Sequence, residues 1–273
     1  MGRGEQPQEI ADRLLAACER MTTTASISST SPTFGQEEAY EVLDLIGAHR
    51  RTNGWQPVGR KIGFTNRTIW QTFGVEAPMW AHLWDRTVVH AAGLTATVSL
   101  GSYVQPRIEP EVVLGLSDSI PSTGDASAVM HRVGWIAAGF EIVHCHFPEW
   151  QFTLADAIAD FGLHGALVVG PPLVVDDHNR EHLTAALATF EATLSCDGAV
   201  VDQGLGANVL GSPALALAHV AEVIAADDRH PSLTAGEIVT TGTITAAWPI
   251  AAGQTWTSDY GALGLGGLTL TLS

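Results

Sequence analysis

Two glutamates separated by one residue offer the clearest chemistry in this sequence. Glu109 and Glu111 stand at the start of the apolar run 112–116, which is typical of a strand buried on both faces. Side chains two apart on a strand point to the same face. A third glutamate, Glu141, lies in the strand-like run 140–147. Three carboxylates from two strands suit a hard divalent ion, although an isolated Glu-x-Glu pair is often only a solvated strand edge.

The basic residues are unevenly divided between the two types. The chain has twelve arginines and a single lysine, Lys61. An ammonium is a compact donor whose pKa shifts readily, whereas a guanidinium cannot take part in proton transfer. We therefore expect Lys61 to act in catalysis. The alternative is that a single lysine remains by chance and has no catalytic role.

Two further groups of titratable residues could contribute. Asp156 and Asp160 are four residues apart and share one face of a helix, where they could act as a general base and its positioner. Acids that merely occupy a helix N-terminus fit equally well. The segment 144–146 (His-Cys-His) would direct both imidazoles away from Glu141, without a C-x-x-C or H-E-x-x-H motif. We interpret it as packing or a polar contact to the substrate rather than a zinc site.

The elements that must position these residues fall into two parts. Residues 1–57 are expected to form a helical segment, with helices at 9–21 and 35–51 joined by a Ser/Thr-rich linker at 22–33. Residues 58–273 are expected to form a β-rich catalytic domain. The predicted fold class is α+β, a mixed sheet or barrel-like core with a helical N-terminus.

Within the second part, short apolar runs and turn signals predict many brief elements. Strands are expected at 58–64, 87–90, 96–100, 107–116, 140–147, 167–170, 189–196, 199–201, 237–241, 255–260 and 268–272. Helices are expected at 67–73, 126–133 and 212–226, a short helix or loop at 154–161, and a loop at 75–84.

Composition narrows the classes of partner. A net charge of −16 at pH 7 argues against nucleic acid and anionic membrane surfaces. No apolar run approaches the ~18 residues of a membrane span. The N-terminus lacks the apolar region of a signal peptide, and three cysteines without C-x-x-C predict a reduced, cytoplasmic compartment. A small anionic substrate is still compatible with the negative net charge, because a bound metal ion makes the charge of its site locally positive.

Several motifs together resemble the 2-keto-4-pentenoate hydratase and 4-oxalocrotonate decarboxylase group of the fumarylacetoacetate hydrolase superfamily. The resemblance covers most of residues 8–271. The segments that carry it are GRKIGFTN at 59–66, QPRIEPE at 105–111, FEIV at 140–143, LADAIAD at 154–160, GAN at 206–208 followed by Pro213, and GEIVTTG at 236–242.

One segment departs from the family pattern. After D-x-I-A-D the family usually continues Asn-Ala-Ser. This chain instead has Phe161, Gly162, Leu163 and His164. We therefore expect an aromatic ring and an imidazole to replace small polar groups beside the substrate.

The resemblance implies a mixed β-sandwich roll preceded by helices, and a homo-oligomer. It implies Mg²⁺ or Mn²⁺ held by Glu109, Glu111 and Glu141. Lys61 would lie by the 2-oxo oxygen of the substrate, Asp156 would position Lys61 or a water, and His164 could act as acid or base. The residues expected to contact the substrate are Phe64, Thr65, Asp85, Phe161 and Thr241.

The substrates implied are 2-oxo or 2-hydroxy-enoic acids from the degradation of aromatic compounds. A hydratase, a metal-dependent lyase, would add water to a substrate such as 2-keto-4-pentenoate. The same metal-bound enolate would serve decarboxylation of 2-oxo-3-hexenedioate (4-oxalocrotonate). No extra arginine for a second carboxylate is evident, which favours the hydratase. A C–C bond hydrolase that uses His164, and a non-catalytic module that keeps a structural metal, are alternatives.

Overall fold

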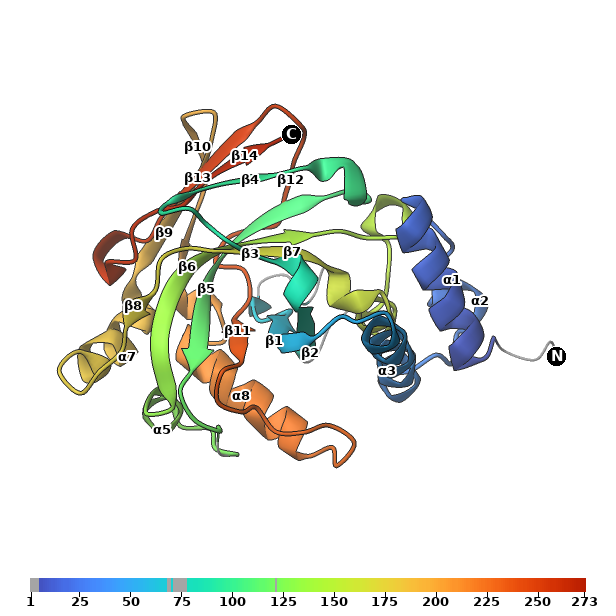
Figure 1. Cartoon of the computed structure of the whole chain (residues 1–273), viewed down its shortest axis with the longest axis horizontal. Coiled ribbons are helices and arrows are strands. Elements are labelled where there is room, and N and C mark those ends of the chain that lie inside the picture. The colour runs from blue at the N-terminus through green and yellow to red at the C-terminus, as the bar shows by residue number, and fades with distance from the viewer. Residues whose placement is uncertain (1–4, 68–69, 71–77, 121) are drawn as a thin grey trace.

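The computed structural model describes residues 5–67, 70, 78–120 and 122–273. The N-terminal helices lie at one side of a strongly curved β structure, and further helices cover its lower face in the view of Figure 1. This arrangement confirms the α+β fold, with mixed sheets and a helical N-terminal segment.

Three helices form the N-terminal segment: α1 (Pro7–Arg20), α2 (Ile27–Thr30) and α3 (Gln36–Thr52). Proline in the first turn starts α1, because its fixed φ suits that turn. The short α2 lies within the segment expected to be a linker. The apolar faces of α1 and α3 pack with α6 (Leu154–Ala159) and β2 (Met79–Trp84).

The strands form two sheets within the described residues. The larger sheet has nine strands in the order β2-β1-β11-β5-β6-β7-β3, with β12 paired to β5 and β8 paired to β6. Its strands are β1 (Pro57–Gly63), β2, β3 (Val88–His90), β5 (Arg107–Leu116), β6 (Val133–Val143), β7 (His164–Val169), β8 (Leu173–Val174), β11 (Ile238–Thr240) and β12 (Trp248–Pro249). The smaller sheet, in the order β10-β9-β13-β14-β4, contains β4 (Thr95–Val98), β9 (Glu191–Cys196), β10 (Ala199–Leu205), β13 (Thr255–Asp259) and β14 (Thr269–Leu272).

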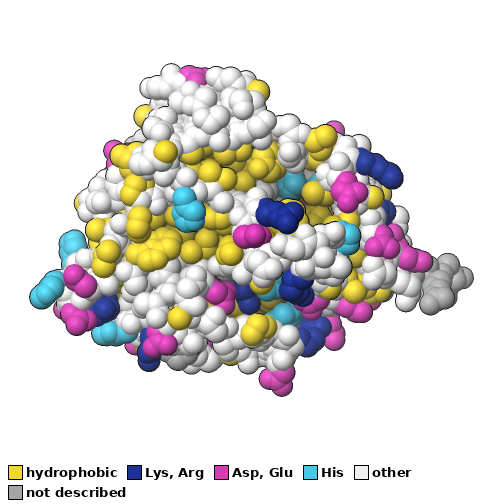
Figure 2. Space-filling model, viewed as in Figure 1, with side chains coloured by type: hydrophobic (Ala, Val, Ile, Leu, Met, Phe, Trp, Pro, Cys, Tyr) yellow, Lys and Arg dark blue, Asp and Glu magenta, His cyan; other side chains and the backbone are white. Residues whose placement is uncertain are grey.

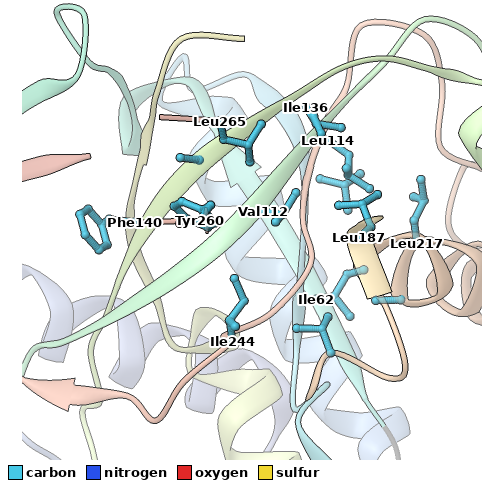
Figure 3. Close-up of a cluster of buried hydrophobic side chains, with 14 of the residues drawn as sticks. Ile62, Val112, Leu114, Ile136, Phe140, Leu187, Leu217, Ile244, Tyr260 and Leu265 are labelled. Carbon is cyan, nitrogen blue, oxygen red and sulfur yellow. The ribbon is translucent and has the colours of Figure 1, made fainter. Parts of the chain in front are cut away.

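The largest hydrophobic core joins the two sheets to three helices: α5 (Ala126–Met130), α7 (Arg180–Thr189) and α8 (Pro213–Ala225). Figure 3 shows Val112 and Leu114 of β5 close to Leu217 of α8 and Leu187 of α7. Alternate residues of β5 therefore anchor the strand in this core. The opposite face of β5 carries Arg107, Glu109 and Glu111 in its first half, whereas Val113 packs in a separate hydrophobic cluster.

The central strand pairings fix where the functional residues can lie. β5 and β6 are antiparallel, and Glu109 stands directly opposite Glu141. β1 is parallel to β11, with Gly59 opposite Ile238 and Lys61 opposite Thr240. Side-chain bulk is excluded at Gly59, because a Cβ there would lie 1.8 Å from a backbone oxygen of Ile238.

Some predicted elements differ from the structure. The loop expected at 75–84 is wrong over 79–84, which form β2 antiparallel to β1. The strand expected at 140–147 ends at residue 143, so the segment 144–146 lies outside it. The helix expected at 67–73 falls mostly outside the described residues.

Two organisational predictions have different outcomes. The division at residue 57 coincides with the start of β1, but the core around α1 and α3 spans both parts, so two separate domains stay a prediction. Among the described residues, none of the helices combines the length and hydropathy required to span a membrane.

Candidate functional site

The three glutamates expected to bind metal come together on one face of the large sheet. Glu109 and Glu111 project from β5, and Glu141 projects from the facing position on β6. One oxygen from each carboxylate lies within 4.8 Å of the other two. That spacing allows one ion to contact all three carboxylates.

The crowding of three carboxylates in this cluster favours either a bound cation or protonation of Glu109 and Glu111. Glu111 and Glu141 are fully buried. No hydrogen-bond donor among the described residues reaches Glu111 Oε1 or Glu141 Oε2. Buried carboxylates without donors are costly, and the one nearby ammonium, Lys61, offsets only one of three negative charges. The donor set therefore fits a hard divalent cation.

The pKa values of the three glutamates are shifted by their burial and by the charges close to them. Burial, partly offset by Lys61, raises the pKa of Glu109 to about 7. Burial and the neighbouring carboxylates raise the pKa of Glu111 well above its usual range. The pKa of Glu141 falls to about 2, because contacts with Lys61 and His164 outweigh its burial. Glu141 is thus the carboxylate that stays ionised most readily.

Lys61 approaches the cluster from β1. Its Nζ lies 3.2 Å from Glu141 Oε1, and the residue is only 3% exposed. Burial alone would lower the pKa of Lys61, but the charges of Glu141, Glu109 and Glu111 together raise it. The ammonium form therefore dominates at neutral pH while these carboxylates are ionised.

A tight turn after β11 supplies a backbone donor to the cluster. The N–H of Gly242 donates to Glu111 Oε2 at 2.8 Å. Gly242 has φ +100°, and a Cβ there would lie 1.8 Å from the hydroxyl of Thr65. Only glycine allows this approach, which explains the glycine that ends the segment 236–242.

A cavity of about 160 Å³ opens beside Glu109 and Lys61. It is smaller than the roughly 300–1,000 Å³ of drug-sized ligand pockets, so it suits a small acid. Phe64 and Thr65, two of the residues expected to contact the substrate, line it. The cavity is also lined by Arg107, Trp150, Phe152, Leu163, Thr243 and Thr245.

His164 was expected to be an acid or base at the substrate, and the structure places its ring between Glu141 and Thr87. Its Nδ1 lies 2.7 Å from Glu141 Oε1, and its Nε2 lies 2.8 Å from the Thr87 hydroxyl. Burial lowers its pKa despite the contact with Glu141. Because an ionised carboxylate only accepts hydrogen bonds, Nδ1 of the neutral ring is the donor. This hydrogen bond orients the carboxylate of Glu141.

Asp156 was expected to position Lys61 or a water, and the structure shows it in contact with two other residues. Its carboxylate accepts from the backbone and hydroxyl of Ser28, and from the backbone and hydroxyl of Thr153. It therefore caps α6 and ties that helix to α2. Asp160, considered as its partner, contacts the backbone N–H and Nδ1 of His146.

Three of the residues expected at the substrate lie elsewhere. Asp85 is exposed and accepts from the backbone N–H of Gln56. Phe161 packs against the guanidinium of Arg50, whose Cζ lies 4.7 Å from the ring centroid. Thr241 donates its hydroxyl to the carbonyl of Val112. The structure gives each of these side chains a contact outside the cavity, and their contact with a substrate stays a prediction.

Arg107 is the main cavity residue that the sequence analysis missed. It shares the strand face of Glu109 and lines the cavity, with its Cζ 4.2 Å from the centroid of the Trp150 ring. The salt bridges found among the described residues do not include Arg107. The two-residue spacing to Glu109 could have identified it. The three aromatic residues in the segment 147–152 could have indicated that Trp150 and Phe152 line an apolar part of the cavity.

Comparison with known proteins identifies the family. The family model for the fumarylacetoacetate (FAA) hydrolase C-terminal region matches residues 75–271. The chain belongs to the fumarylacetoacetate hydrolase family. This confirms the resemblance drawn from the motifs.

The curated relatives of this family member include two kinds of lyase. A 4-oxalocrotonate decarboxylase from Pseudomonas sp. is 31% identical over 210 residues, 77% of each chain. A 2-keto-4-pentenoate hydratase from Burkholderia vietnamiensis is 29% identical over 257 residues, 93% of this chain and 94% of the relative. Similarity alone therefore does not separate the two reactions.

Solved structures of the family show the same fold. 4-Oxalocrotonate decarboxylase from Pseudomonas putida G7, complexed with magnesium and adipate, superposes with a TM-score of 0.88 at 24% identity, covering 100% of this chain and 99% of that one. Fumarylpyruvate hydrolase from Pseudomonas aeruginosa, in complex with Mn²⁺ and pyruvate, gives 0.57 at 14% identity, covering 78% and 88%. The N-terminal helices are therefore part of a fold that the decarboxylase shares over its whole length.

Proposed function

We propose that this protein is a divalent-metal-dependent lyase acting on a 2-hydroxy-dienoate or 2-oxo-enoate. The observation that carries the proposal is the buried cluster of Glu109, Glu111 and Glu141, with Lys61 at the edge of a small cavity. The named activities of the relatives, hydratase and decarboxylase, support it. Mg²⁺ or Mn²⁺ is the cofactor that this all-oxygen donor set favours.

The roles of the chain's residues follow from their positions. The bound cation would act as a Lewis acid toward the 2-oxo acid and its developing enolate charge. Lys61 holds or moves a proton at the 2-oxo oxygen, because its Nζ is at the cavity and next to Glu141. Phe64, Phe152 and Trp150 line the cavity and exclude water from the hydrocarbon part of the substrate.

Hydration of a substrate such as 2-keto-4-pentenoate is the first reaction we propose. Decarboxylation of 2-oxo-3-hexenedioate is a second candidate, and Arg107 specifically favours it. The absence of an arginine for a second carboxylate was the reason to prefer hydration, and Arg107 at the cavity removes that reason. C–C bond hydrolysis loses support, because both ring nitrogens of His164 are engaged.

One incubation separates these reactions. The Mg²⁺-loaded protein is mixed with 2-hydroxypenta-2,4-dienoate or with 2-oxo-3-hexenedioate, and dienol absorbance and CO₂ are followed together. Loss of absorbance without CO₂ indicates hydration, and CO₂ release from the diacid indicates decarboxylation. Consumption of neither substrate would contradict the proposal and would favour a metal-holding module without catalysis.

We also propose a cytoplasmic homo-oligomer. Figure 2 shows a broad hydrophobic area across the middle of one face, where charged side chains are fewer than at its edges. Exposed apolar residues of the strands, including Val174 and Val200 at 62% exposure each, support burial against a second copy. Light scattering coupled to size-exclusion chromatography tests this state, and a monomeric mass would contradict it.

A further inference from the structure

The segment 144–152, which connects β6 to α6, carries two of the aromatic side chains that line the cavity, Trp150 and Phe152. Its backbone is unusual, because Glu149 and Trp150 have φ values of +56° and +59°. Gln105, which is hydrogen-bonded to this segment, has φ +50°. Residues other than glycine rarely adopt this left-handed region, and such strain persists only where surrounding contacts hold it. The contacts of the segment therefore decide where its aromatic rings lie.

Gln105 holds the segment through both its side chain and its backbone. Its Nε2 donates to the carbonyl oxygens of Cys145 at 2.9 Å and Phe147 at 2.8 Å. Its Oε1 accepts from the backbone N–H of Glu149 at 2.8 Å, and its backbone carbonyl accepts from the indole Nε1 of Trp150 at 3.0 Å. The side-chain bonds need two N–H donors and one acceptor on the same group, which an amide provides and a carboxylate does not. Asparagine has the amide but is one methylene shorter.

The Trp150 ring in turn contacts Arg107 at the cavity. The Cζ of Arg107 lies 4.2 Å from the centroid of the ring, and the ring centroid of Phe152 lies 6.1 Å from that of Trp150. A guanidinium over an aromatic face is attracted by about 0.5–2 kcal/mol, which restricts an otherwise flexible side chain. A long side chain that is already ordered loses less conformational freedom when a ligand binds. The contact with Trp150 therefore prepares Arg107 to bind an anionic group in the cavity.

We propose that Gln105 is a positioning residue for the binding of diacids. By holding the segment 145–150, it keeps the Trp150 ring against Arg107, and Arg107 presents its guanidinium to the second carboxylate of a 2-oxo diacid. Gln105 is not among the described residues that line the cavity, so it acts through these two side chains rather than on the substrate. The inference rests on the proposed function in one respect, namely that this cavity binds a 2-oxo acid.

The test uses ligands that bind without reacting, so that it does not depend on turnover. 2-Oxohexanedioate is the saturated form of 2-oxo-3-hexenedioate, and 2-oxopentanoate is the saturated form of 2-keto-4-pentenoate. Isothermal titration calorimetry with the full-length, Mg²⁺-loaded protein measures the dissociation constant of each. In Gln105→Met we expect the constant for the diacid to rise about three- to tenfold, the cost of ordering one long side chain, and that for the monoacid to change less than about twofold. Mg²⁺ affinity should stay the same, because the glutamate cluster is not altered.

A double-mutant cycle separates positioning from a general loss of structure. Trp150→Leu removes the ring through which Gln105 acts, so Gln105→Met should cause little further loss of diacid affinity in that background. Gln254→Met is the matched control. Gln254 also accepts hydrogen bonds from a backbone N–H and an indole, those of Ala251 and Trp256, but it lies outside the cavity lining of the described chain. This variant should lower the free energy of unfolding and leave both dissociation constants unchanged.

Several results would overturn the role of Gln105. They are an unchanged diacid affinity in Gln105→Met, an equal loss for the diacid and the monoacid, and an effect of the same size in the Trp150→Leu background. If Gln105→Met fails to fold, Gln105→Asn takes its place in the cycle.

The same titrations distinguish this inference from the proposed function. If neither 2-oxo acid binds the unmodified protein, the cavity is not a 2-oxo acid site, and both proposals fail. If the ligands bind and Gln105→Met acts as expected, but the incubation with the unsaturated substrates shows no turnover, only the lyase activity is contradicted.

Discussion

The Nδ1 atom of His164 lies 2.7 Å from Oε1 of Glu141, the carboxylate that also contacts Lys61. The imidazole thus stands behind the metal cluster rather than at the substrate, and its N–H orients a ligand oxygen.

Removing the His164 contact should weaken metal binding. We expect His164→Leu to lower Mg²⁺ affinity about 10- to 100-fold, because Glu141 loses the donor that orients it. His164→Asn, which keeps an N–H donor, should recover part of that loss. Isothermal titration calorimetry measures both. The exposed His90→Asn is the control, and equal affinity in all three variants would show that His164 is not a positioning residue.

Lys61→Met should separate proton transfer from metal binding. We expect kcat to fall about 100- to 10,000-fold, the usual contribution of a positioned acid or base. Mg²⁺ affinity should stay equal or increase, because a cation beside Glu141 is removed. Lys61→Arg should not recover kcat, since a guanidinium does not exchange its proton near neutral pH. Near-normal turnover in Lys61→Met would remove Lys61 from the mechanism.

Arg107→Gln distinguishes diacids from monoacids. If Arg107 binds a second carboxylate, KM for 2-oxo-3-hexenedioate should rise about tenfold or more, the value of one charge-assisted hydrogen bond. KM for 2-hydroxypenta-2,4-dienoate should change far less. Steady-state kinetics with both substrates provides the comparison. An equal rise for both would mean that Arg107 acts on the cavity shape or on Glu109 instead.

Leu163, rather than Phe161, should control substrate preference in the segment that departs from the family pattern. Leu163 lines the cavity, whereas Phe161 packs on Arg50. We expect Leu163→Ser to change the ratio of kcat/KM for the two substrates, and Phe161→Leu to leave it unchanged. The reverse result would show that the Phe161 ring reaches the substrate. Thermal unfolding checks that both variants fold.

Stability should fall as the pH rises above about 6.5. Burial lowers the pKa of His146, but its contact with Asp160 at 2.6 Å dominates, and the pKa rises from 6.5 to about 9. The folded state therefore holds a proton that the unfolded chain releases first. This contribution, up to about 3 kcal/mol, is complete below pH ~6.5 and is lost as the pH passes ~9.

Urea unfolding between pH 6 and 9 measures this loss. In His146→Gln the part of the slope that comes from His146 should disappear. A slope that persists unchanged in the variant would assign it to other groups.

The sequence was most informative where residues act through local spacing. Glu109 and Glu111 share a face because they are two apart, and the apolar run after them identifies β5. The same parity rule would have placed Arg107 at the cavity. By contrast, β2 is buried on both faces, so its side chains show no alternation, and β2 was taken for a loop.

Roles that depend on tertiary direction could not be obtained from the sequence. Asp156 lies in a family motif, but its partners come from two different places. Ser28 belongs to the distant N-terminal segment, and Thr153 is the N-cap of α6. Asp85 and Thr241 are likewise hydrogen-bonded to backbone atoms. Residue type indicated that these side chains need partners, but only the packed structure shows which partners they have.

The alternation of Arg60 and Lys61 makes β1 sensitive to pairing errors. A slip of one residue would turn the guanidinium toward the acid cluster and the ammonium toward Glu237, the partner of Arg60. The fold would keep a positive charge at both places, so such a misfolded form could be compact yet unable to transfer a proton. Gly59, which admits no side chain against Ile238, keeps the strand aligned and thereby protects activity during folding.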